Sequence, residues 1–230
     1  MMEQDRMKPK LVCLSYTITE NTQMYKETPK PRFAPHSSMA KGDSSDSFQI
    51  EINSHTATHV DAPGHFIERG RKIGSYTPSE LEFDTVEIIS IQKKAGEWVE
   101  RKDLEKSVQK MEAEALLIKT GFSKLIGSEI YRTQNPGLDA DAIEWARSHM
   151  KNLRMIGVDT ISISSQSDSP RGRAAHKAAF EQKAGGSGPL LIVEGMDMEP
   201  LHAKGLKRLH LFPWFGGPVD SSPCTIFAEV

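Results

Sequence analysis

The feature that most limits what this chain can fold into is a run of histidines near residue 60. Three of the eight histidines, His55, His59 and His65, fall within one short segment that also contains Asp61. The β-branched residues between them favour an extended backbone. Because alternate side chains of an extended backbone share a face, we expect His55, His59 and Asp61 to project to one side. Pro63-Gly64 then turns the chain, so His65 returns toward that side from another direction.

Two imidazoles and a carboxylate form a ligand set for a divalent transition metal such as Zn²⁺ or Mn²⁺. A single histidine is more often a solvated or satisfied core residue, but three histidines and an aspartate among small residues favour a metal centre. The HExxH arrangement of zinc proteases is excluded, because Thr56 follows His55.

The rest of the composition excludes several classes of protein. The net charge of −2 argues against binding driven by nucleic-acid phosphates, and no apolar run reaches the roughly 18 residues that a membrane helix needs. The N-terminus has no secretory h-region, and Cys13 and Cys224 cannot build a disulfide framework or a CxxC site. We therefore expect a cytoplasmic protein that acts on a small molecule, with no membrane or nucleic-acid partner. No glycine-rich nucleotide loop is present.

The hydrophobic pattern predicts one α/β domain over residues 1–230, with a mixed β-sheet core and flanking helices. Residues 1–9 are expected to form a frayed tail, and residues 18–45, which hold three prolines, a long loop or lid. Strands are predicted at 10–17, 47–53, 85–92, 115–119, 153–158, 189–194, 207–212 and 224–230, and helices at 102–112, 140–150 and 172–184.

The segment SHTATHVDAPGHF resembles the HxGTHxDxPxHF signature of the cyclase family of metal-dependent hydrolases, which includes kynurenine formamidases (arylformamidases) and isatin hydrolases. Shorter stretches across the chain also resemble the family: Leu14-Ser15, Leu117–Gly121, Ile156–Thr160 with Ser162-Ile163, Ile192–Met196, Phe212-Pro213 and Ser222-Pro223. The first motif is highly specific, and the others are supportive. The resemblance implies the family's swivelling β/β/α-like fold.

The resemblance also implies roles for individual residues. His55, His59 and Asp61 would bind a first metal ion, and Asp61 would bridge to a second ion held by His176 and Glu194. His65 would be the catalytic acid/base. Each subunit would bind one or two ions of Zn²⁺ or Mn²⁺. The protein would form a homodimer or homotetramer. The substrate would be a small amide, formamide, lactam or lactone, with N-formylkynurenine as the best single guess.

The chain departs from the family in several places. Ala57 replaces the glycine between the first two histidines, which predicts a negative φ there. Residues 183–188 form a glycine-rich insertion that lengthens the interval between His176 and Glu194, the two ligands of the second metal that the resemblance implies. The expected pocket walls are Tyr25, Phe33 and Phe66; the other candidate residues are assigned structural or solvated roles.

Two rival functions stay open. One is a lyase or cyclase-type reaction, in which His65 would move a carbon-bound proton. The other is a metal-binding or interaction protein without catalysis. The presence of His65 beside His55, His59 and Asp61 counts against a protein without catalysis, because a site that only binds metal does not need His65.

Overall fold

The centre of the molecule is a mixed sheet in which parallel and antiparallel strands are joined. The computed structural model describes residues 10–183, 185–201 and 206–230. Its nine-stranded sheet has the order β5-β12-β13-β4-β11-β10-β8-β6, and β1 also pairs with β13. Its strands are β1 (Leu11–Cys13), β4 (His59–Asp61), β5 (Glu82–Phe83), β6 (Val86–Ser90), β8 (Ala115–Lys119), β10 (Met155–Val158), β11 (Leu191–Glu194), β12 (Arg208–Pro213) and β13 (Ser221–Glu229). The predicted tail, residues 1–9, and Ala184 and His202 lie outside the described residues.

The two halves of the sheet differ in direction. Strands β6, β8, β10 and β11 run parallel, whereas β4 runs antiparallel to both of its neighbours, β11 and β13. The expected mixed α/β domain is confirmed. Strand β4 therefore lies at the junction between the parallel half and the antiparallel half.

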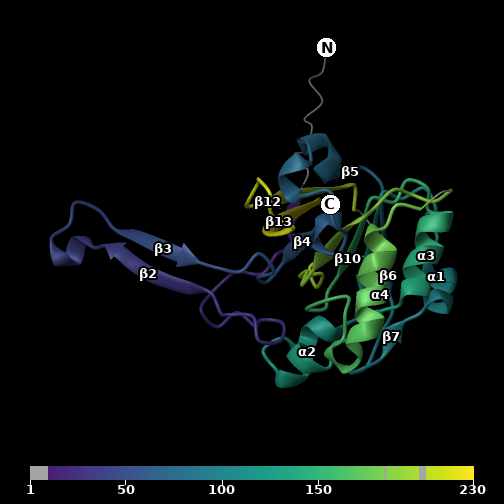
Figure 1. Cartoon of the computed structure of the whole chain (residues 1–230), viewed down its shortest axis with the longest axis horizontal. Coiled ribbons are helices and arrows are strands. Elements are labelled where there is room, and N and C mark those ends of the chain that lie inside the picture. The colour runs from purple at the N-terminus through teal and green to yellow at the C-terminus, as the bar shows by residue number, and fades with distance from the viewer. Residues whose placement is uncertain (1–9, 184, 202–205) are drawn as a thin grey trace, which may run out of the picture.

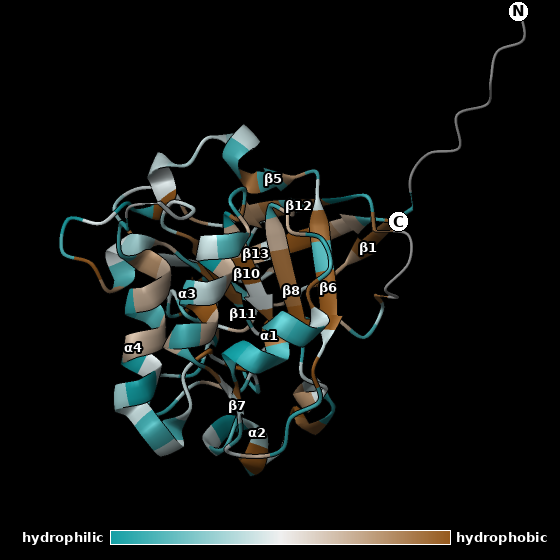
Figure 2. Cartoon of the chain, turned by 90° about the vertical axis from the view of Figure 1, so that its right-hand side faces the viewer, coloured by the Kyte–Doolittle hydropathy of each residue, from teal (hydrophilic) through white to brown (hydrophobic). Residues whose placement is uncertain are grey.

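Helices α1 (Arg101–Ser107), α3 (Ala140–His149) and α4 (Ser169–Phe180) cover one face of the parallel half, and α2 (Glu129–Thr133) lies apart from them (Figure 1). Leu116 and Ile118 of β8 pack in the core under α3 and α4, while Ala115 and Leu117 pack in a second core on the opposite face. Burial on both faces explains why this strand reads as an unbroken apolar run, visible as brown ribbon in Figure 2.

Two predicted helices have different bounds in the structure. The helix expected at 102–112 ends at Ser107, because Val108 turns extended (φ −73°, ψ 129°), and Met111 is 40% exposed rather than buried. The helix expected at 172–184 starts earlier, at Ser169, and ends at Phe180. The Asp168 side chain accepts a hydrogen bond from a backbone N–H of the first turn, which places the start of the helix there.

The expected long loop at 18–45 is only partly a loop. Strand β2 (Arg32–Ser37) pairs with β3 (Ser47–Glu51) in a hairpin that projects from the body of the molecule (Figure 1). Because proline is rare in strands, the prolines of this segment argue against a strand. The pairing register shifts between Pro35 and Ser37, and at such an irregularity the missing backbone N–H of a proline is tolerated. Helix α2 and the short strands β7 (Trp98–Val99) and β9 (Gly137–Leu138) carry no clear periodic signal.

Candidate metal centre

Strand β4 supplies the two most deeply placed polar side chains of the site. His59 and Asp61 lie two residues apart on the strand and so share a face. In the sheet, His59 lies opposite Glu194 of β11, and the distance from His59 Nε2 to Glu194 Oε2 is 3.4 Å. The junction strand thus sets an imidazole and two carboxylates side by side.

His55 reaches the same group from a turn before β4 rather than from a continuous strand. Its Nδ1 lies 3.1 Å from Asp61 Oδ1. The backbone bends at Ala57, whose φ of 54° is left-handed, so the expectation of a negative φ is wrong. The bend is held by backbone contacts: the Ala57 carbonyl accepts a hydrogen bond from His59 Nδ1 at 2.9 Å, and the Thr58 hydroxyl donates to the Gly195 carbonyl at 2.6 Å.

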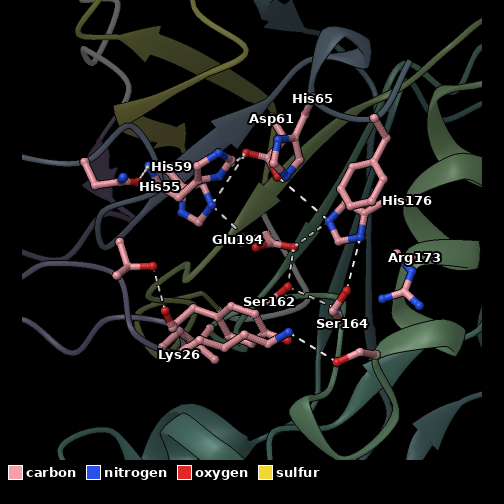
Figure 3. A pocket seen from close by; sticks show the side chains of 16 residues that line it. Lys26, His55, His59, Asp61, His65, Ser162, Ser164, Arg173, His176 and Glu194 are labelled. Carbon is pink, nitrogen blue, oxygen red and sulfur yellow. Dashed lines mark hydrogen bonds and ion pairs between the residues drawn. The ribbon is translucent and has the colours of Figure 1, made fainter. Parts of the chain in front are cut away.

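Helix α4 brings His176 to the other side of Asp61 (Figure 3). His176 Nε2 lies 3.9 Å from Asp61 Oδ2 and 3.4 Å from Glu194 Oε1. Its Nδ1 donates to the Gly172 carbonyl at 3.0 Å, and Phe66 stacks on the ring with centroids 4.6 Å apart. The carbonyl and the stacked ring fix the tautomer and direction of the imidazole, leaving Nε2 turned toward the carboxylates.

Glu194 is held in place by groups from the loop after β10. The Ser162 hydroxyl and the Ile163 backbone N–H both donate to its Oε1, at 3.0 and 2.7 Å. These donors leave Oε2 directed at His59. The sequence analysis gave Ser162 no role in the site, since nothing in its local pattern shows that it meets Glu194.

Four of these side chains form a buried group with unsatisfied ligand atoms. His59, Asp61, His176 and Glu194 are between 1% and 4% exposed. His59 Nε2 and both carboxylate oxygens of Asp61 have no hydrogen-bond partner, although a buried polar atom without one costs about 1–3 kcal/mol. Ligand atoms that bind Zn²⁺ tetrahedrally at 2.0–2.2 Å lie roughly 3.3–3.6 Å from one another. Most nitrogen–oxygen distances between the imidazoles and carboxylates of this group are close to that range. The donor set therefore fits a divalent ion.

The imidazoles and carboxylates of the site shift each other's pKa values. Burial acts to lower the pKa of His55, but its hydrogen bonds to Asp220 and Asp61 outweigh burial and raise it to about 10. Burial acts to raise the pKa of Asp61, and the neighbouring imidazoles of His59 and His55 outweigh it, so the pKa falls well below its usual range. The carboxylates and imidazoles of the group thus favour each other's charged forms, and a bound cation would take over that role from the imidazole protons.

His65 stands at the open side of the group. It ends a short 3₁₀ turn, Pro63–His65, and its ring centroid lies 4.3 Å from that of His55. Its Nδ1 lies 2.7 Å from Asp220 Oδ2, while His55 Nε2 lies 3.4 Å from the same oxygen. The shorter distance is that of a charge-assisted hydrogen bond rather than of two atoms that share an ion. We therefore describe Asp220 as a partner of His65.

Asp220, like Ser162, is a site residue that the sequence analysis missed. It directly precedes β13, whose pairing with β4 carries it next to the histidines. The hydrogen bonds from His55 and His65 hold the pKa of its carboxyl well below the usual range. Its only sequence signal is its place after the Gly-Gly-Pro-Val turn, and 155 positions separate it from His65.

The side chains of the group open into a cavity of about 330 Å³. Tyr25 and Phe66, two of the three expected walls, line it, and burial raises the pKa of Tyr25 to about 12. Phe33 does not reach this cavity: it belongs to β2 and lines a different one beside Trp214. Lys26 and Arg173 contribute positive charge to the walls (Figure 3).

Other parts of the chain add little chemistry. Asp159 accepts hydrogen bonds from Thr120 and Gly121 rather than reaching the site, which agrees with the structural role expected for it. Cys224 is buried. No helix in the described part of the chain has the length and hydropathy of a membrane span.

Comparison with sequences of known proteins identifies a family. A family model described as putative cyclase matches residues 12–165. The chain is also 32% identical over 91 residues to an uncharacterized protein of Haemophilus influenzae. That match covers 39% of this chain and 60% of the length of the relative.

Comparison with solved structures gives the same fold. A potential metal-dependent hydrolase with cyclase activity has a TM-score of 0.73 and 20% identity, over 96% of this chain and 98% of that one. Isatin hydrolase A from Labrenzia aggregata, bound to benzyl benzoate, has a TM-score of 0.76 and 18% identity, over 96% and 93%. A predicted metal-dependent hydrolase from Bacillus stearothermophilus has a TM-score of 0.72 and 19% identity, over 96% and 98%.

Proposed function

The chain belongs to the putative cyclase family, and we propose that it is a metal-dependent hydrolase of a small amide, formamide or lactam. The observation that carries the proposal is the set of buried ligand atoms without hydrogen-bond partners, His59 Nε2 and the two carboxylate oxygens of Asp61. These atoms converge with Glu194 and His176 at the floor of a cavity large enough for a small substrate.

We assign the ligands to one or two ions of Zn²⁺ or Mn²⁺. His55, His59 and Asp61 have ligand atoms within 4.8 Å of one another and would hold the first ion. His176 and Glu194 would hold the second together with Asp61, whose two oxygens face the two histidine groups. A bound ion would lower the pKa of a water bound to it toward neutrality, and the ion would also polarise the substrate carbonyl.

His65 is proposed to hold and move the proton of the reaction. Its Nδ1 is engaged by Asp220, so its Nε2 is the atom that can accept a proton and donate it to the leaving nitrogen. At 26% side-chain exposure, His65 is more open than the buried ligands and can meet the substrate. Asp220 would keep the ring in one orientation and stabilise its protonated form.

N-formylkynurenine is the first substrate to try, and cyclic amides such as isatin are the second because three of the similar solved structures are of isatin hydrolases. The test is a panel of formamides, isatin, cyclic imides and lactones, offered to protein stripped by chelation and then restored with Zn²⁺ or Mn²⁺.

We expect no turnover by the stripped protein, recovery with metal, and one oxygen from labelled water in the product. A product without labelled oxygen would point to a lyase or cyclase-type reaction. No turnover of any compound after metal is restored would favour a binding protein.

A further inference from the structure

The cavity above the metal centre has two cationic walls that no acidic side chain neutralises. Lys26 comes from the loop before β2, and Arg173 from α4. Within the part of the chain that the structure describes, neither side chain forms an ion pair. Arg171, only two residues from Arg173, instead contacts Asp139 at 2.6 Å and Glu100 at 3.8 Å. Lys26 and Arg173 are both exposed at the mouth of the cavity and, unlike Arg171, have no carboxylate partner among the described residues that would compete with a ligand.

The charge of the cavity supports an anionic ligand. Asp61 and Glu194 line the cavity, and Asp220 lies behind two of its lining residues, His55 and His65, so the site holds three carboxylates. One divalent ion at the proposed site balances two of them, and Lys26 and Arg173 then outnumber the remaining carboxylate and leave the cavity positive. A concave surface of one sign raises the local concentration of ligands of the opposite sign.

The position of Arg173 limits where the anionic group can lie. Arg173 precedes His176 by three residues on α4, so both side chains lie on one face of the helix, with Cβ atoms about 5–6 Å apart. Figure 3 shows Arg173 beside His176 and Lys26 along a different wall. Lys26 Nζ lies 3.2 Å from Ser169 Oγ, at the start of the same helix, so both cations lie beside the first two turns of α4.

We propose that Arg173 and Lys26 form a carboxylate-binding subsite, so that the substrate is an anion whose carboxylate lies about one helical turn from the bond that is cleaved. This proposal rests on the proposed hydrolase function. A guanidinium matches a carboxylate with two parallel hydrogen bonds, and an ammonium adds a point charge. Neutral lactams of the isatin type would leave both cations without a partner and would be poorer substrates.

The test compares 3-formamidobenzoate, in which the ring holds the carboxylate about 5 Å from the amide nitrogen, with its neutral isostere 3-formamidobenzamide, measuring formate release by the metal-loaded protein. We expect kcat/KM to favour the carboxylate. Arg173→Ala should lower the ratio of the two values by about tenfold to a hundredfold, the range of a hydrogen bond to a charged group. Arg173→Lys should lower the ratio less, Lys26→Ala should also lower it, and Arg173→Glu should reverse it.

Matched controls come from the same elements. Lys177 lies one turn beyond Arg173 on α4, and Lys30 lies in the same loop as Lys26; both are exposed and neither lines the cavity. Lys177→Ala and Lys30→Ala should leave the ratio unchanged. An equal fall in these controls would show a general effect of surface charge and would overturn the subsite.

Calorimetric binding of the two compounds to the metal-loaded protein separates the subsite from the hydrolase function. Equal turnover and equal binding of both compounds would overturn the subsite and leave the hydrolase standing. Tighter binding of the carboxylate that depends on Arg173, without any turnover, would support the subsite and contradict the hydrolase. Neither turnover nor a charge preference in binding would overturn both.

Discussion

The inner and outer halves of the site are built in opposite ways. The inner half, His59, Asp61, His176 and Glu194, is at most 4% exposed and includes buried atoms without partners. The outer half, His65 and Asp220, has side chains 26% and 33% exposed that hydrogen-bond to each other. Buried unsatisfied atoms call for an ion, whereas a hydrogen-bonded and accessible imidazole suits proton transfer. His55, a proposed metal ligand whose side chain is 25% exposed, contacts Asp61 of the inner half and Asp220 of the outer half and connects the two.

The strongest test of this contrast removes an inner ligand. His59→Ala should abolish metal binding and activity together, because the ion loses a nitrogen ligand in the most buried part of the site. Elemental analysis after dialysis and the hydrolysis assay measure the two effects. Unchanged metal stoichiometry in the variant would show that His59 is not a ligand.

Changing the outer half should separate rate from metal content. His65→Ala should retain the metal and lower kcat by about 10²- to 10⁴-fold, the range for loss of a general acid/base. His149→Ala, a change at an exposed histidine remote from the cavity, is the control and should leave kcat unchanged. A normal kcat for His65→Ala would remove the proton-transfer role.

Asp220 should show a smaller effect of the same kind. Asp220→Asn keeps a hydrogen-bond acceptor for His65 but loses the charge, so kcat should fall by about 10- to 100-fold with metal content preserved. In Asp220→Ala, kcat should fall further than in Asp220→Asn. Asp84→Asn, at an exposed carboxylate paired with Arg208, serves as the control. A purely structural role would lower the melting temperature of Asp220→Asn without changing kcat.

The smallest predicted effect lies in the turn that joins the halves. Ala57 has a φ of 54°, a conformation that costs an alanine more than a glycine. Ala57→Gly should therefore raise the free energy of unfolding by about 0.5–1 kcal/mol, with activity preserved. Chemical denaturation of the two proteins measures the difference, and a loss of stability would mean that the turn is not strained.

The sequence predicts best those elements whose conformation is set by their own residues, and it predicts poorly those set by contacts with distant parts of the chain. The strand at 115–119 and the helix at 140–150 are found within one residue, because an apolar run and a 3.6-residue period act within the element. The hairpin partner β2 was missed, because its pairing with β3 outweighs its local composition.

The same distinction holds for the site. The segment with His55, His59 and Asp61 can be read directly, since its residues are neighbours in sequence. Asp220 reaches His65 only through the pairing of β13 with β4, which no local pattern reveals. Phe33 was placed in the pocket from its type alone, and the hairpin carries it elsewhere.

The most direct test of the account is the position of the metal itself. Crystals of the protein loaded with Zn²⁺ or Mn²⁺ should give an anomalous peak about 2.0–2.2 Å from His59 Nε2 and an oxygen of Asp61. A second peak beside His176 and Glu194 would establish the two-ion site. An active, metal-loaded protein with no peak at the inner group would contradict the central claim that these buried atoms hold the ion.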